Sequence, residues 1–455
     1  MLRRRKGEGP DDRTRDMILF SIVAALLVLI VLVTLRAPPF LAFVIAALFA
    51  ALLLGVPLAR IPGAIEKGIG DTIGPVVITI VLGAFLGKLI ADSGAAQRIA
   101  DTLIGLCGPS RLPIAMAATG FLVGIPLFYN VGFVLMVPLI FSIVRRAGLP
   151  AVHVGIPLLA GLSIAHGFLP PHPSPTAVVA QLNADLGVTL IYGLIVGIPT
   201  LAIAGPLFAM TLKGIATTAS PLFDAATAAR ERALPGAFAS FACALLPVVL
   251  IAGATALHYA PLAPATAAAI GFIGNPTIVL LLSIAVGMVA LGRSAGLSRA
   301  EIMDGFGVAI RDIAPILLII AGAGALKQVL VESGADKTLA AQLAQLPLPP
   351  LALGWLLACV IRIAVGSATV AGLSAGGLIQ PVIVATGADA NLMVLAIGAG
   401  SLMCSHVNDS GFWMFKEYFG LSLRDTFRSW SMMETLVGVF GLVFVLSLDA
   451  VLRAV

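Results

Sequence analysis

Charged residues are scarce in this sequence of 455 residues: 11% are Asp, Glu, Lys or Arg, and 60% are hydrophobic. Soluble domains carry about 25% charged residues, so a soluble protein of this length could not cover so much apolar surface. The alternation of polar and apolar residues that is typical of a membrane β-barrel is also missing, because the apolar runs are long and continuous. Since roughly 20 apolar residues span a bilayer core, the composition predicts an all-α polytopic membrane protein with about 12 membrane segments.

Motifs for ATP-driven transport and zinc catalysis are missing as well. The sequence contains no H-E-x-x-H, and GAFLGKL at 83–89 lacks the spacing and the hydroxyl residue of a nucleotide-binding P-loop. The four cysteines lie in apolar stretches and form no C-x-x-C pair. We therefore expect neither an enzyme nor a protein with a cofactor or a bound metal.

The basic residues near the N-terminus predict the topology. Residues 1–6 read MLRRRK and precede the first long apolar run, at 17–35. Positively charged segments stay on the cytoplasmic side of a membrane, so we expect residues 1–16 to form a basic cytoplasmic N-terminus. The segment is too short for nucleic-acid binding and has no interleaved aromatic residues. The sequence thus predicts a multi-pass protein of the cytoplasmic (inner) membrane whose partner is the lipid bilayer and not nucleic acid.

A polar stretch at 213–235 divides the chain into two parts of similar size. We interpret it as a cytoplasmic linker between a first transmembrane half, residues 17–212, and a second half, residues 236–455. The halves resemble each other at a constant offset of 240 residues. The matching positions are Ser93–Gly94–Ala95 with Ser333–Gly334–Ala335, Pro75 with Pro315, and His166 with His406.

The charges of two corresponding loops suggest that the halves are inverted. Arg145 and Arg146 in the first half correspond to the uncharged residues 385–386 in the second. A basic loop opposite an uncharged one indicates opposite sides of the membrane. Two inverted structural repeats with broken helices or re-entrant hairpins are a recurring architecture of secondary transporters, and this is the fold that we expect.

Four polar interruptions, two in each half, break the apolar runs at 124–130, 166–176, 362–370 and 405–413. Irregular backbone at membrane depth is tolerated only beside protein or a water-filled cavity. The second interruption contains four prolines, so one helix must end near Phe168 and another begin near Thr176. The free N–H groups at such a helix start are suited to a carboxylate. An ordinary extramembrane loop is the alternative interpretation of this block.

Ionisable and hydroxyl side chains at these interruptions are the candidate site residues. Asp409 is costly inside a membrane unless it is protonated, paired or hydrated, although it could simply cap a helix. Histidine has an ordinary pKa of about 6.5, so we predict that His166, His406 and Asp409 carry protons. Arg362 faces the protein interior or snorkels, and in the first case it would add a countercharge for an anion. The predicted substrate-binding residues are Asn130, His172, Ser174, Thr176, Arg362, Ser367, Thr369, Asn408 and Ser410.

Three stretches of the sequence resemble the gluconate permease family of proton symporters, within the ion transporter superfamily. They are HGFLPPHPSPT at 166–176, GSATVAG at 366–372 and LAIGAGSLMCSHVNDSGFWMFKEYFG at 395–420, and the resemblance covers nearly the whole chain beyond the N-terminus. It implies a proton-coupled symporter that imports gluconate or a related small hydroxy-carboxylate. One departure is Ser174, where the family often has glycine, so that a hydroxyl lies beside the predicted site.

The residues alone leave other functions open. His166, His172, His406 and Asp409 could gather around zinc in an intramembrane metal-dependent enzyme. A sodium-coupled carboxylate carrier or a channel would also use polar groups at membrane depth, although titratable histidines favour protons. The sequence is also compatible with a homo-oligomer.

Overall fold

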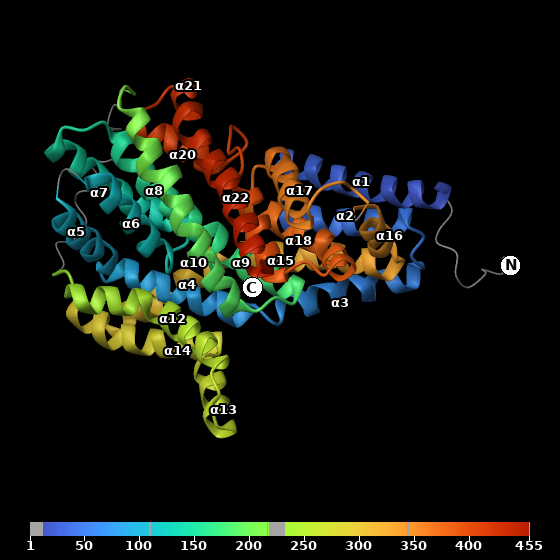
Figure 1. Ribbon diagram of the computed structural model, residues 1–455, viewed down its shortest axis with the longest axis horizontal. Helices are drawn as coiled ribbons and strands as arrows, with labels where there is room; N and C mark the ends of the chain where they lie inside the picture. Colours follow the sequence, from blue (N-terminus) through green and yellow to red (C-terminus); the bar gives the residue numbers. More distant parts are fainter. Residues whose placement is uncertain (1–11, 109–110, 216, 218–232, 344, 455) are drawn as a thin grey trace.

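The computed structural model describes residues 12–108, 111–215, 217, 233–343 and 345–454, and within these ranges every regular element is a helix (Figure 1). The all-α prediction is therefore confirmed for this part of the chain. Most of the predicted basic N-terminus and most of the 213–235 linker lie outside the described residues. Seven helices are long and apolar enough to cross a membrane, and two bent helix pairs raise the number to nine if each pair is one span. Five shorter apolar helices accompany them.

The helices of the first half begin and end as follows: α1 Asp12–Thr34, α2 Pro39–Leu53, α3 Ile61–Ile73, α4 Val77–Asp92, α5 Ala95–Cys107, α6 Leu112–Gly124, α7 Tyr129–Ala147, α8 Ala151–Phe168, α9 Pro173–Leu182 and α10 Leu186–Ala202. The second half contains α12 Ala237–His258, α13 Pro264–Ile273, α14 Pro276–Gly287, α15 Arg299–Ser333, α16 Ala335–Leu343, α17 Pro350–Val365, α18 Ala368–Thr386, α19 Ala390–Leu402, α20 Ser410–Phe419, α21 Leu423–Thr426 and α22 Met432–Ala454. A π-helical segment, η6 (Phe427–Ser431), joins α21 to α22.

The repeated S-G-A sequence forms the same turn in both halves. It connects α4 to α5 and α15 to α16, and its glycine is left-handed in both places, with φ of 76° at Gly94 and 72° at Gly334. The hydroxyl of Ser93 accepts a hydrogen bond from the Ala95 N–H at 3.4 Å, and that of Ser333 accepts one from Ala335 at 3.3 Å. The helix order around these turns is also repeated, with α6 to α9 matched by α17 to α20. We propose that residues 17–212 and 236–455 are the two structural repeats, and their inversion across the bilayer stays a prediction.

The two halves differ at the matched prolines. Pro75 lies between α3 and α4, which meet at an angle of 47°. Pro315 lies inside α15, which continues for 35 residues. Proline removes a backbone hydrogen bond and often bends a helix. Helix α15 nevertheless stays continuous at Pro315, and it packs along its length against α2, α3 and α4.

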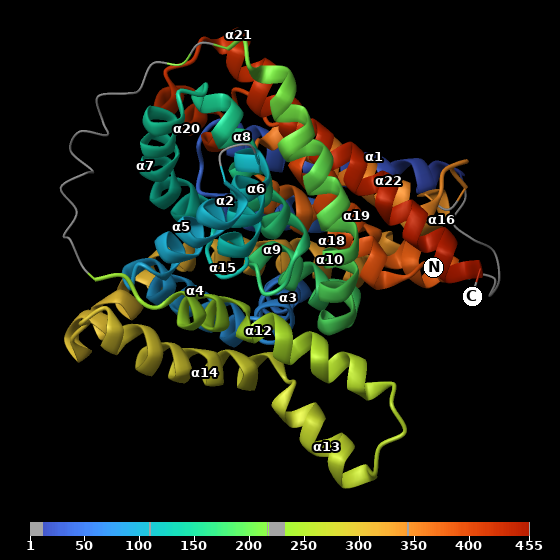
Figure 2. The same ribbon diagram turned by 60° about the vertical axis from the view of Figure 1, so that its left-hand side comes forward.

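Helices of the first half pack against helices of the second half. Helix α9 of the first half packs against α18 of the second, where a Cβ on Gly376 would lie only 2.4 Å from Gln181 Oε1. Helix α7 contacts α20 through aromatic rings, with 5.6 Å between the ring centroids of Phe133 and Tyr418. These contacts bring interruptions that are far apart in sequence to the middle of one helical body. Helix α13, in contrast, projects away from that body (Figure 2).

Candidate functional site

Three helices begin at one cavity of about 400 Å³. The cavity is lined by the starts of α7, α18 and α20. From each helix, the residue before the start and the first two helical residues take part: 128–130, 367–369 and 409–411. The first N–H groups of a helix have no intrahelical acceptor and carry the positive end of the helix dipole. The cavity is therefore surrounded by backbone donors and partial positive charge, without a lysine or arginine in its lining.

Local sequence explains why these helices begin here. The Ser367 side chain accepts a hydrogen bond from the Val370 N–H at 3.3 Å, and the Asp409 side chain accepts one from the Gly411 N–H at 3.0 Å. Serine and aspartate are strong N-cap residues because their oxygens satisfy such free donors. Helix α7 starts after extended backbone at Phe128, which has φ −61° and ψ 144° and no side-chain cap. Its first N–H groups remain available to other acceptors.

A glycine allows two of the interruptions to touch. Gly366, which follows α17, has φ of 81°, and a Cβ there would lie 2.3 Å from the carbonyl oxygen of Asn408. Just before it, the carbonyl of Ile363 accepts a hydrogen bond from Asn408 Nδ2 at 2.8 Å and faces His406 Nε2 at 2.9 Å. Carbonyls in the last helical turn lack partners within the helix, and the segment before α20 supplies them here.

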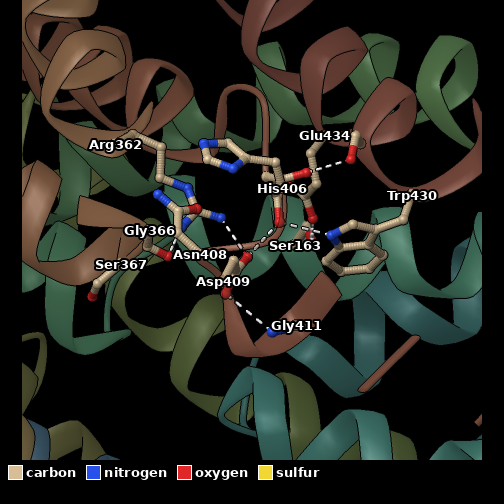
Figure 3. A network of polar contacts seen from close by, with 12 residues as sticks. Ser163, Arg362, Gly366, Ser367, His406, Asn408, Asp409, Gly411, Trp430 and Glu434 are labelled. Carbon is tan, nitrogen blue, oxygen red and sulfur yellow. Dashed lines mark hydrogen bonds and ion pairs between the residues drawn. The ribbon is translucent and has the colours of Figure 1, made fainter. Parts of the chain in front are cut away.

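A buried ion pair joins the same two interruptions (Figure 3). Arg362 Nη2 lies 2.5 Å from Asp409 Oδ2, and Arg362 Nη1 donates to the Gly366 carbonyl. The Ser405 hydroxyl donates to the same carboxylate oxygen and accepts a hydrogen bond from Trp430 Nε1 at 2.7 Å. Asp409 thus has a cation, a hydroxyl and a backbone N–H as partners. Arg362 is committed to this network and does not line the cavity as the free countercharge that we expected.

The structure brings together seven of the predicted site residues and leaves five outside the cavity lining. The seven that line it are Asn130, His166, Ser367, Thr369, Asn408, Asp409 and Ser410. The five others are His172, Ser174, Thr176, Arg362 and His406. Arg362 contacts Asp409 of the lining, and His406 contacts the Ile363 carbonyl. The other three belong to the proline-rich block.

The proline-rich block ends α8 at Phe168, as predicted, but α9 begins at Pro173, three residues earlier than expected. Proline at the first position of a helix is favourable because its missing N–H would have had no partner there. His172 is buried, with Nε2 2.6 Å from the Gly124 carbonyl oxygen. Ser174 is buried where α9 packs on α18, close to Gly372. Apart from His166, the block therefore connects helices next to the cavity and does not line it.

His166 and His406, which match in sequence, do not occupy equivalent positions in the helices of the two halves. His166 lies in the last turn of α8, whereas His406 lies after the end of α19. Counted from the helix that follows, the equivalent residues are His172 and Asp409, which are the N-cap residues of α9 and α20. The break before α20 is longer than the break before α9, and this difference shifts the histidines.

Sequence reasoning missed a second acid in the cavity. Glu434, on α22, lines the cavity although only 2% of it is exposed, and its Oε1 accepts a hydrogen bond from the Ser163 hydroxyl at 2.5 Å. An acid inside the apolar run 431–452 was a signal of the same kind as the one that identified Arg362. Tyr129, Ser163 and Trp430 also belong to the lining. Tyr129 lies in the first polar interruption, directly before Asn130, whereas Ser163 and Trp430 lie outside the four interruptions.

The zinc site considered from the sequence is not formed by the described residues, among which no three His, Cys, Asp or Glu side chains gather as metal ligands. The rings of His166 and His172 lie 5.4 Å apart, but His172 faces the Gly124 carbonyl. Ser374 lies in a G-x-S-x-G sequence, yet it is buried inside α18 and not at the strand-to-helix turn of a hydrolase nucleophile.

Comparison with solved structures shows a fold shared with a transporter. The chain superposes on the crystal structure of the Alcanivorax borkumensis YdaH transporter with a TM-score of 0.67, covering 91% of this chain and 97% of that one. The two sequences are 17% identical, so this likeness concerns the fold alone.

Comparison with characterised sequences gives relatives that match over nearly their full length. The high-affinity gluconate transporter of Escherichia coli is 44% identical over 431 residues, which are 94% of this chain and 98% of the relative. The L-idonate transporter of the Gnt-II system of the same organism is also 44% identical, with the same coverage. The gluconate permease of Pseudomonas aeruginosa is 42% identical over 96% of this chain and 98% of the relative. These relatives are transporters, in agreement with the expectation that the chain is not an enzyme.

A family model described as GntP family permease matches residues 17–451. The match spans both halves, and the sequence resemblance to the gluconate permease family is thereby confirmed. The apolar helices and this match make the protein a multi-pass membrane protein, and the chain belongs to the GntP permease family.

Proposed function

We propose that this protein is a proton-coupled secondary transporter that imports gluconate or a related small hydroxy-carboxylate across the cytoplasmic membrane. Two relatives at 44% identity are named for gluconate and for L-idonate. Both compounds are six-carbon chains with one carboxylate and several hydroxyl groups. The substrate class is thus a polyhydroxy monocarboxylate.

The observation that carries the proposal is the convergence of three helix starts on one cavity. Helix N-termini bind anions through free N–H groups and the helix dipole. A carboxylate in this cavity would meet the donors of α7, α18 and α20 from different sides. Because the charge of Arg362 is already paired with Asp409, these helix starts are the main source of positive potential for the substrate.

The remaining lining suits a polyol. Asn130, Thr369 and Ser410 face the cavity, and none of their side chains has a hydrogen-bond partner among the described residues. Such groups can donate to and accept from hydroxyls of a bound substrate. The volume of about 400 Å³ lies in the range of small-molecule sites.

Proton coupling is supported by the titratable groups in the same lining, which include His166, Asp409 and Glu434. Ionisable residues at membrane depth mark proton or substrate routes in transporters. His406 lies beside Asn408 and contacts the Ile363 carbonyl, so it stands next to the route and not on the cavity wall.

The test is uptake of radiolabelled gluconate by proteoliposomes that contain the purified protein. With an inward proton gradient we expect uphill accumulation that collapses with a protonophore, and competition by idonate. Accumulation driven by a sodium gradient alone would contradict proton coupling. If gluconate equilibrated across the membrane without accumulating under any gradient, the protein would be a channel or facilitator. If the protein took up no gluconate and no other hydroxy-carboxylate, the substrate class would be refuted.

A further inference from the structure

We infer that Glu434 is the residue that carries the coupling proton. This inference rests on the proposed function and assigns a role to one residue of the same cavity. It concerns an acid outside the polar interruptions, on a helix that otherwise looks like an ordinary apolar span.

The position of Glu434 is unusual for a carboxylate. Its side chain is buried between α22 and α8, where the Ser163 hydroxyl donates to Oε1 at 2.5 Å. The other oxygen, Oε2, is buried and has no hydrogen-bond partner in the described part of the chain. Since the residue lines the cavity, this oxygen is the natural place for a proton that exchanges with water in the cavity.

The neighbouring charges do not compensate an ionised Glu434. The groups that act on it are Arg362, Asp409 and the hydroxyls of Ser163 and Tyr129, and His166 lies in the same lining. Arg362 is held by Asp409 and by the Gly366 carbonyl. No salt bridge among the described residues includes Glu434. A buried carboxylate without a cation partner is costly in its charged form, and a second anion beside it raises that cost, so an anion in the cavity favours the protonated acid.

Asp409 has the opposite environment. It accepts hydrogen bonds from Arg362, Ser405 and the Gly411 backbone. Hydrogen bonds and an adjacent cation favour the ionised form of a carboxylate. Asp409 therefore holds the two interruptions together through these contacts, and we assign the proton-carrying role to Glu434 instead.

Charge repulsion then couples the proton to the substrate. An anionic substrate in this cavity would lie close to Glu434, and two nearby anions in a low-dielectric site repel strongly. The substrate binds well only while Glu434 is protonated, and because proton and anion are taken up together, the loaded site has the same net charge as the unloaded site with ionised Glu434. When the cavity opens to the cytoplasm and the substrate leaves, its repulsion is lost and entering water hydrates the carboxylate, so Glu434 releases its proton and the carrier returns without it.

The main test compares Glu434→Gln with wild type in proteoliposomes. The amide keeps the shape and the Ser163 contact but cannot release a proton. We expect the variant to lose proton-driven accumulation, while exchange of external against internal gluconate stays within about tenfold of wild type, the most that one neutral hydrogen bond explains. The matched control is Glu417→Gln, an exposed acid on α20, which should accumulate gluconate like wild type.

Two results would overturn the assignment. One is normal proton-driven accumulation by Glu434→Gln, and the other is equal loss of exchange and accumulation, which would make the carboxylate a substrate ligand. Failure of the proposed function is distinguishable, because it would appear in wild type as absence of gluconate uptake.

A second measurement uses the unmodified protein and does not depend on a variant that folds. Hydrophobic carbodiimides react with protonated carboxyl groups in apolar surroundings, and peptide mass spectrometry locates the adduct. We expect labelling at Glu434, reduced when gluconate is present, and no labelling at Asp409. Labelling at Asp409 without labelling at Glu434 would refute the inference.

Discussion

Arg362 and Asp409 are 47 residues apart in sequence, and their charged groups meet at 2.5 Å in the interior, with side chains that are 4% and 15% exposed. Arg362 lies near the end of α17, and Asp409 directly precedes α20. The pair thus fixes the position of one helix start relative to the helix end beside it. It organises the cavity without occupying it.

We predict that Asp409→Asn destabilises the protein by about 3 kcal/mol, because it leaves the Arg362 charge buried without its partner. Transport should fall together with stability, for exchange as well as for accumulation. Thermal unfolding in detergent and gluconate exchange measure the two effects. The double variant Arg362→Gln, Asp409→Asn should regain part of the stability, since it removes the unpaired charge.

The matched control is Asp449→Asn, which breaks the exposed ion pair of Asp449 with Arg453 on α22. Exposed pairs contribute at most about 1 kcal/mol, so this variant should unfold close to wild type. Equal destabilisation by the two single variants would contradict a structural role specific to the buried pair.

Gly366→Ala should abolish transport. The new Cβ would meet the Asn408 carbonyl oxygen at 2.3 Å, so the two interruptions would have to separate. Gly387→Ala provides the comparison, because Gly387 also follows a helix with positive φ but has open space around its Cβ position. Its cost is only the left-handed backbone, about 1–2 kcal/mol. Comparable uptake by the two variants would show that the close approach is dispensable.

The breaks were predictable from sequence because their causes are local. Proline at 170–175 and the capping residues Ser367 and Asp409 act within a few positions of the chain. The S-G-A turns were predictable for the same reason, since a serine hydroxyl and a left-handed glycine form the turn by themselves.

The partners of the polar residues were not predictable. Whether Arg362 meets a substrate or Asp409 depends on how the end of α17 crosses the start of α20, and no local rule specifies that crossing. The proline-rich block turns toward α18 because Gly372 and Gly376 allow α9 to approach closely. Glu434 was not predicted because it lies outside the four polar interruptions, in the first turn of the apolar helix α22.

Thr369→Val should weaken gluconate binding without lowering stability. Thr369 lines the cavity near the start of α18, and the loss of one neutral hydrogen bond to a substrate hydroxyl should raise KM up to about tenfold. Thr386→Val, at the other end of the same helix, is the control, because that hydroxyl only bonds the Val382 carbonyl. A KM that responds equally to both changes would exclude a direct contact of Thr369 with the substrate.

Ser174→Gly should leave substrate preference unchanged. Ser174 is buried between α9 and α18 and does not line the cavity. Its hydroxyl lies where a Cβ on Gly372 would come within 2.8 Å, so it faces the backbone of α18. We expect the ratio of KM values for gluconate and idonate to stay within about twofold of wild type, which is less than one hydrogen bond contributes. Competition uptake measures this ratio, and a reversal of the preference would place Ser174 in contact with the substrate during part of the transport cycle.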